Sequence, residues 1–252
     1  MEISKIIKEQ QGKPALLIDG KPVFAGYQWG NTPEPDGFAH AAAAREFAKA
    51  GVHNYAFDMG DNEWCGPSKS RNGQGIPQDH FDFTKLKDRF ERVLDADPDA
   101  RFHLRMHLEK VNTTNWWLEL YPGEAELTED CGFPVEPDRP RYSQSYASTI
   151  WRDHANIFLR EYVRQIEAIG MSDRVIAWQT GHGYTSECFK WSAVGQDIGD
   201  FSAPMALYFR NWLVSRYDAN EKALREAWAD QNVTFGTAKV PSIEQQLSTG
   251  HM

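Results

Sequence analysis

Charged side chains gather where two predicted strands end. Asp58 lies near the end of one strand, and Arg105, His107 and Glu109 occupy alternate positions at the end of the next. Alternate residues of a strand share one face, so the last three side chains point the same way. Carboxylate and guanidinium groups bind hydroxyl groups through charge-assisted hydrogen bonds. This chemistry suits a hydroxyl-rich ligand, although Arg105 and Glu109 would equally form a structural ion pair.

A further carboxylate, Glu187, follows the predicted strand 173–180 in the run Thr-Ser-Glu-Cys-Phe-Lys-Trp. Its Cys, Phe and Trp neighbours would desolvate the carboxyl group and raise its pKa. Hydrolysis of a glycosidic bond uses one protonated carboxyl group as general acid and a second as nucleophile or base. Glu187 is the candidate general acid/base, and the alternative is a solvated loop glutamate.

Aromatic residues are abundant, since the 252-residue chain contains nine Trp and is 13% aromatic. Trp29 at the end of the first predicted strand, and Trp64, Trp116 and Trp117 in predicted loops, are candidates for stacking on the C–H faces of sugar rings. Core packing is the alternative for each. Trp116 and Trp117 are adjacent and cannot both face one sugar, and Trp117 is the predicted binding residue.

Other chemistries have weaker support. His103 and His107 share a strand face but would lie about 13 Å apart, too far to bind one metal ion. The sequence has no G-x-S-x-G motif, phosphate-binding glycine loop or dinucleotide fingerprint. We predict no metal and no cofactor.

Composition limits the partners. A net charge of −9 argues against nucleic acid, which requires clustered Lys and Arg. The first twenty residues lack an uninterrupted apolar run, and no segment approaches the length of a membrane span, so we expect no membrane partner. Three widely spaced cysteines suit reduced thiols, which favours a cytoplasmic location. Carbohydrate is the expected ligand.

Strand and helix signals alternate along the chain. Strands are predicted over 22–29, 53–59, 101–109 and 173–180, and helices over 39–50, 82–94, 145–169, 203–217 and 221–229. Ser202 is a suitable N-cap for the helix over 203–217. Strands that alternate with helices imply a parallel sheet with right-handed crossovers.

The strand over 101–109 distinguishes a barrel from a doubly wound sheet. Phe102, Leu104, Met106 and Leu108 alternate with polar residues. A doubly wound sheet buries both faces under helices, whereas a barrel directs one polar row into its lumen. We therefore predict an α/β fold of the TIM-type (β/α) barrel, with about four βα units in a single partial domain over residues 1–252.

The predicted loops over 60–80, 110–144 and 181–200 follow the C-terminal ends of strands, where barrel enzymes build their active sites. A half barrel has two open sheet edges with unpaired backbone groups. We expect either a second copy of the chain, as a homo-oligomer, or a missing C-terminal half to cover them.

Several runs of the sequence resemble glycoside hydrolases of the β-galactosidase-like family 42 kind, in the clan of retaining (β/α)₈ glycosidases. They are LIDGKPVF at 17–24, WWLELYP at 116–122, RVIAWQT at 174–180, TSECFKW at 185–191 and AWADQNVTFGTAKVPS at 227–242. The resemblance covers the first half of that barrel. It implies hydrolysis of β-linked sugars by a retaining mechanism, with the acid/base glutamate after strand four at Glu187.

Two features depart from that clan. Many members have Asn directly before the acid/base glutamate, where this chain has Ser186. The clan's nucleophile follows strand seven, and we expect this chain to end before strand five, so no residue here takes that role. The alternative function is a non-catalytic carbohydrate-binding or interaction module built on a partial barrel.

Overall fold

The structure is a computed structural model that describes residues 4–10, 12–30, 38–60, 63–65, 81–108, 116–132, 143–180 and 199–248. The chain forms two compact units. One, the sheet unit, comprises Met1–Leu108 with Asn156–Cys188, and the other, the helical unit, comprises Glu109–Ala155 with Phe189–Met252. The boundary falls inside helix α4 (Thr149–Ala168). The expectation of one domain over 1–252 stays a prediction.

The sheet unit begins with an antiparallel sheet of β1 (Ser4–Gln10), β2 (Lys13–Ile18) and β3 (Lys21–Val23). Asp19 and Gly20 join β2 to β3 with positive φ values of 50° and 74°. Positive φ at both central residues suits the two-residue turns of hairpins, for which Asp-Gly is a preferred sequence. This hairpin takes residues 21–23 away from the predicted strand 22–29, which the structure therefore splits into two strands.

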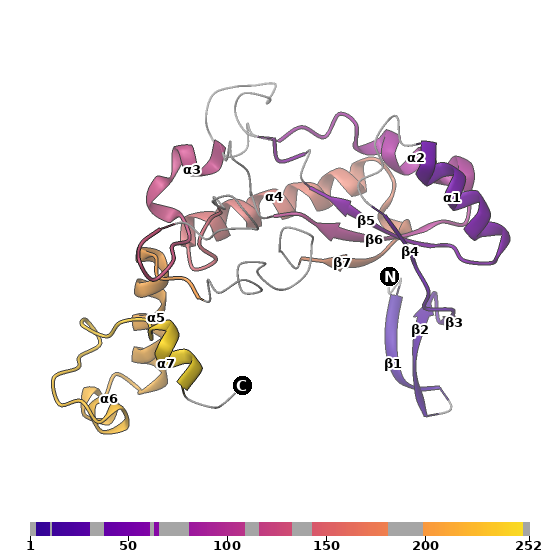
Figure 1. Ribbon diagram of the computed structural model, residues 1–252. Coiled ribbons are helices and arrows are strands. Elements are labelled where there is room, and N and C mark those ends of the chain that lie inside the picture. Colours follow the sequence, from indigo (N-terminus) through magenta and orange to yellow (C-terminus); the bar gives the residue numbers. More distant parts are fainter. Residues whose placement is uncertain are drawn as a thin grey trace. The chain divides into compact units, whose positions relative to one another are not determined.

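The second sheet of this unit is parallel. Its strand order is β4 (Gln28–Gly30), β5 (Asn54–Met59), β6 (Arg101–Met106) and β7 (Val175–Gln179) (Figure 1). Each neighbouring pair is parallel, and Asp58 lies opposite Arg105, which lies opposite Gln179. The predicted parallel sheet is confirmed, and its closure into a barrel stays a prediction.

The two faces of this sheet differ as the alternation in the sequence predicts. Phe57, Phe102 and Leu104 are at most 2% exposed. Helices α1 (Phe38–Lys49), α2 (Leu86–Ala96) and α4 contact this apolar side, α4 through the Tyr162 ring, which lies edge-on to Trp178 of β7 at 6.1 Å. The ring of Phe90 in α2 lies edge-on to Phe102 at 4.8 Å, and the Tyr55 hydroxyl donates to the Ala44 carbonyl of α1 at 3.1 Å. The opposite, polar face carries the charged residues.

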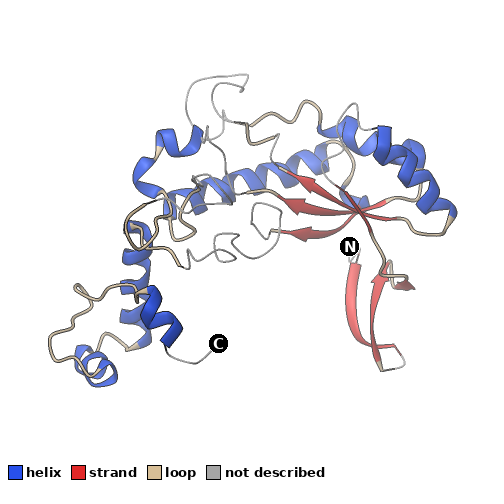
Figure 2. Ribbon diagram, in the orientation of Figure 1, coloured by secondary structure: helices blue, strands red, loops and turns tan. Residues whose placement is uncertain are grey.

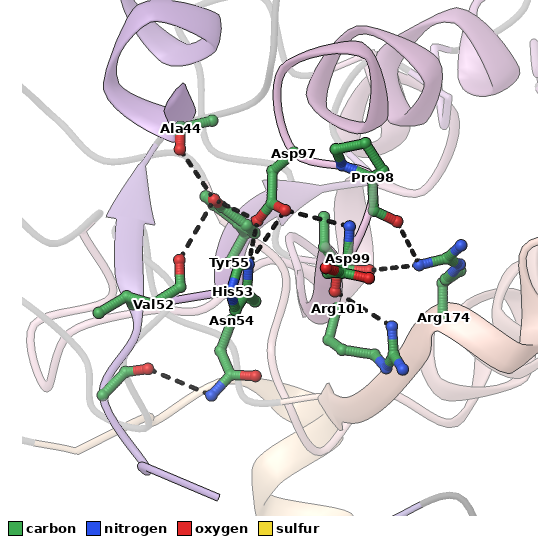
Figure 3. Close-up of polar contacts among 12 residues, drawn as sticks. Ala44, Val52, His53, Asn54, Tyr55, Asp97, Pro98, Asp99, Arg101 and Arg174 are labelled. Atoms are coloured by element: carbon green, nitrogen blue, oxygen red, sulfur yellow. Dashed lines mark hydrogen bonds and ion pairs between the residues drawn. The ribbon is translucent and has the colours of Figure 1, made fainter. Parts of the chain in front are cut away.

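The N-terminal ends of β5 and β6 are joined through one buried carboxylate (Figure 3). Asp97 is 1% exposed and accepts hydrogen bonds from the Tyr55 hydroxyl at 2.7 Å, from His53 Nδ1 at 2.9 Å and from the Asp99 amide at 3.0 Å. Burial, followed by the hydrogen bond to Asp97, raises the pKa of Tyr55 well above its ordinary value. Tyr55 therefore stays a protonated donor that holds the two strand ends together.

The described elements of the helical unit are mostly helices (Figure 2). They are α3 (Trp116–Leu120), the 3₁₀ helix η2 (Pro122–Glu124), the start of α4, α5 (Ala203–Arg216), α6 (Glu221–Trp228) and α7 (Ile243–Ser248). Leu213, Leu224, Val233 and Ala238 form a buried cluster between α5 and the segments that follow it. Ser202 caps α5 as predicted, because its side chain accepts from the Met205 amide at 3.3 Å.

All five helices predicted from the sequence are present, with ends that differ by a few residues. The longest is α4, at 20 residues. Within the parts of the chain that the structure describes, no helix combines the length and the apolar character needed to cross a membrane.

Candidate functional site

The polar face of the parallel sheet brings together residues from all four strands. Trp29 of β4, Ala56 of β5, His103 of β6 and Ala177 of β7 form one row, and Asp58, Arg105 and Gln179 form the next. Neighbours in register on parallel strands point to the same face. The sheet therefore places Trp29, Asp58 and Arg105, which the sequence selected separately, in one constellation.

Arg105 is the centre of this constellation. Its Nη1 lies 3.0 Å from Asp58 Oδ1, and both side chains are largely buried, at 7% and 14% exposed. The guanidinium carbon lies 4.8 Å from the centre of the Trp29 ring, a cation–π distance. His107 Nε2 lies 4.0 Å from the other Asp58 oxygen. A carboxylate and an indole thus hold the guanidinium in one orientation, which suits recognition of a ligand's hydroxyl groups.

Trp29 has the accessibility that a stacking residue requires. It is 59% exposed although it lies in a strand. Two further aromatic side chains belong to the same face, because the Tyr27 and His103 rings lie edge-on at 5.5 Å. Burial raises the pKa of Tyr27. Burial, followed by the positive charge of Arg105, lowers the pKa of His103, so its imidazole is neutral at neutral pH and can both donate and accept hydrogen bonds.

Two predicted sugar-stacking residues are interior instead, and those assignments are corrected. Trp64 is 1% exposed and its ring stacks on Phe158 at 5.2 Å. Gly60 at the end of β5 adopts φ +97°, and its carbonyl accepts a hydrogen bond from the Trp64 amide at 3.0 Å. Trp117 is 0% exposed and donates its indole N–H to His154 Nδ1 at 3.2 Å. Both rings pack in the core and are unavailable to a ligand.

Glu109 and Glu187 lie outside the described residues. The role of Glu187 as acid/base and that of Glu109 in ligand binding stay predictions.

The structure adds residues that sequence reasoning did not select. Tyr27, His103 and Gln179 all belong to the polar face. The hydrophobic alternation in β6 predicted that His103 lies on this face, but the positions of Tyr27 and Gln179 on it follow only from the register of the strands.

Sequence reasoning also missed a buried ion pair. Arg89 of α2 donates to the Glu63 carboxylate, which also accepts from the Gly60 amide at 2.9 Å. This pair anchors the turn that follows β5.

One trio among the described residues has the side-chain types and spacing of a metal site. His53, Asp97 and Asp99 offer ligand atoms within 4.8 Å of one another. The Asp97 oxygens already accept hydrogen bonds from His53, from Tyr55 and from the Asp99 amide (Figure 3). These hydrogen bonds give the trio a structural role, since they link the ends of two strands.

The lowered pKa of His103 predicts how stability depends on pH. The unfolded chain binds a proton at His103 near pH 6.5, whereas the folded chain does so only at lower pH. Unfolding is therefore favoured progressively as pH falls through 6.5 toward the folded-state pKa. His154, whose pKa is lowered mainly by burial, acts in the same direction. Urea unfolding between pH 7.5 and 5 should show a smaller loss of stability in His103→Gln than in the wild type, and equal losses would contradict this assignment.

Comparisons with known proteins give a fold likeness. No family model matches the sequence, and no curated protein matches it. Among solved structures, the fold is similar to that of the beta-galactosidase from the psychrophilic Marinomonas ef1, with a TM-score of 0.58 and 16% sequence identity. The match covers 86% of this chain and 30% of that protein. At this identity the likeness concerns the fold alone, and the aligned part of this chain spans less than a third of the neighbour's length.

Proposed function

We propose that this protein is a β-galactosidase-like glycoside hydrolase that acts on β-linked sugars. In this proposal the parallel sheet belongs to a partial (β/α) barrel of TIM type, and its polar face binds the sugar. The observation that carries the proposal is the constellation of exposed Trp29, with Arg105 over its ring at 4.8 Å and Asp58 paired to Arg105 at 3.0 Å. The fold likeness to a beta-galactosidase supports it.

Each member of the constellation has a part in binding. Trp29 offers its open ring surface to the C–H face of a pyranose. The fixed Arg105 guanidinium and the nearby His107 offer N–H donors to hydroxyl oxygens. Asp58 acts mainly through Arg105, since the ion pair orients the guanidinium. Because these groups are held before the ligand arrives, little side-chain entropy is lost on binding.

The reaction needs two carboxyl groups. We assign general acid/base catalysis to Glu187, on its position after β7 and on the family 42 resemblance. The nucleophile is not assigned in this chain. Among the described strand residues of the polar face, Asp58 is the one carboxylate, and Arg105 holds it. In this proposal, a second copy or a C-terminal half completes the barrel along β4 and β7, the outer strands of the described sheet.

Sugar binding without hydrolysis is the second candidate function. The observation that favours it is the same ion pair, because a carboxylate engaged by a guanidinium is a poor nucleophile. Activity of the wild-type protein on aryl glycosides distinguishes the two candidates.

Two exposed tryptophans on the outer strands allow a matched test of the proposed binding face. Trp29 is in register with Ala56 on the polar face, and Trp178 is in register with Leu104 on the apolar face. Trp29→Ala should weaken binding of methyl β-D-galactopyranoside by about tenfold, the loss expected for one aromatic stacking contact. Trp178→Ala should leave the affinity unchanged. Calorimetric titration measures both, and equal affinities for the wild type and Trp29→Ala would contradict the proposal.

A further inference from the structure

The helical unit contains a pocket of its own, with a volume of about 270 Å³. It is formed by η2, by the residues around the start of α4 and by one side of α5. Its polar lining comes from Glu124, Thr149, Arg152, Tyr208 and Asn211. We propose that this pocket is a second sugar-binding site that takes a single neutral saccharide ring. It goes beyond the proposed function, because it requires neither the sheet face nor Glu187.

The cationic group of the pocket is fixed in place. Arg152 donates from Nη2 to the Ala147 carbonyl at 3.0 Å and from Nε to the Ser148 carbonyl at 3.4 Å. Its guanidinium carbon lies 5.1 Å from the centre of the Tyr208 ring. Nη1 is left to donate to a ligand, because it has no hydrogen-bond partner among the described residues. Arg152 over Tyr208 thus resembles Arg105 over Trp29 in its aromatic contact, although backbone carbonyls hold Arg152 and a carboxylate holds Arg105.

The charged side chains of the pocket lining balance each other. Glu124 and Arg152 carry opposite charges on the same lining. These two charges cancel, so the lining offers neither an anion nor a cation a net opposite charge, which suits a neutral molecule. The carboxylate of Glu124 accepts hydrogen bonds, Arg152 donates them, and the Thr149 hydroxyl and Asn211 amide do both. A ligand that satisfies this set must itself be rich in groups that both donate and accept, as hydroxyl groups are.

The remaining lining is apolar or aromatic. Pro204 and Leu207 line the pocket beside Tyr208, and Tyr208 is 48% exposed. A saccharide ring matches this combination, because it presents C–H surface to apolar and aromatic side chains and hydroxyl groups to the polar ones. Pockets for drug-sized ligands measure roughly 300–1,000 Å³, so the smaller volume here suits one ring rather than an oligosaccharide.

Helix α5 supplies a matched pair of residues for the test. Tyr208 lines the pocket, whereas Trp212, one turn further along, does not, and the two are almost equally exposed at 48% and 49%. Saturation-transfer NMR and titration with methyl β-D-galactopyranoside, methyl β-D-glucopyranoside and methyl β-D-mannopyranoside would be carried out on the protein with Trp29→Ala, which weakens sheet-face binding by about tenfold and leaves the pocket intact. At least one glycoside should still bind in this background.

Adding Tyr208→Ala should weaken that residual binding roughly five- to tenfold, whereas adding Trp212→Ala should leave it unchanged. Tyr208→Phe should retain most of the affinity, since the ring is kept. The proposal is overturned if none of the glycosides binds, or if Tyr208→Ala and Trp212→Ala have the same effect. It is also overturned if Tyr208→Ala changes only the sedimentation coefficient, because the surface would then be a protein contact. Failure of the sheet-face proposal alone would leave the Tyr208 result unaffected.

Discussion

Glu187→Gln is expected to lower turnover of phenyl β-D-galactopyranoside by about 10²–10⁴-fold, the usual contribution of general acid–base catalysis. Phenolate is a poor leaving group at neutral pH, so departure of the aglycone depends on proton transfer from the enzyme. The Gln amide keeps the size of the side chain but cannot supply that proton. Phenol release under saturating substrate measures the effect on kcat.

An exposed glutamate provides the control for this variant. Glu91 on α2 is paired with Lys87 at 3.0 Å, and its side chain is 46% exposed. Glu91→Gln should leave kcat within a factor of two of the wild type. Wild-type activity that survives Glu187→Gln would show that another carboxyl group is the acid/base. A wild-type protein inactive on a panel of aryl β-glycosides would favour the sugar-binding function.

Arg89→Met is expected to lower the free energy of unfolding by about 3–5 kcal/mol, as for the loss of one partner of a buried ion pair. Arg89 and Glu63 are 4% and 2% exposed, and Arg89 donates directly to the Glu63 carboxylate. Without the guanidinium, the Glu63 carboxylate stays buried as a charge, and the Gly60 amide still donates to it at 2.9 Å. Urea denaturation at pH 7 measures the change.

Two comparisons make this stability prediction specific. Lys87→Met removes one partner of an exposed pair on the same helix and should cost at most about 1 kcal/mol. The double variant Arg89→Met with Glu63→Leu should recover much of the loss, since no uncompensated charge is then buried. Similar losses for Arg89→Met and Lys87→Met would contradict the assigned role of the pair.

The alternation of strands with helices was sufficient to predict the parallel sheet, and hydrophobic alternation within a strand predicted its two faces. In β6, Phe102, Leu104 and Met106 are fully buried at 0% exposed, as the pattern predicts, while Arg105 lies on the polar face with Asp58. Alternation fixes the face of each residue because the side-chain period of a strand is two. The helices followed similarly from their periodic apolar residues and from the Ser202 cap.

Strand register and burial in loops could not be predicted in this way. The register of β5 and β6 places Asp58 beside Arg105, a pairing between strands that alternation along a single strand cannot predict. Trp64 and Trp117 lie in predicted loops, where the sequence carries no periodic signal that separates a buried ring from an exposed one. Their burial depends on tertiary partners, Phe158 and His154, that are distant in the chain.

The central claim is that the polar face of the parallel sheet binds a β-linked sugar at Trp29, and NMR of the protein with ¹⁵N-labelled tryptophan indoles tests it most directly. Single Trp→Phe variants assign the Trp29 and Trp178 signals. On titration with methyl β-D-galactopyranoside, the account predicts a saturable shift of the Trp29 signal, while the Trp178 signal, from the apolar face, stays in place. A Trp29 signal that does not move while the sugar binds elsewhere, or does not bind, would contradict the account.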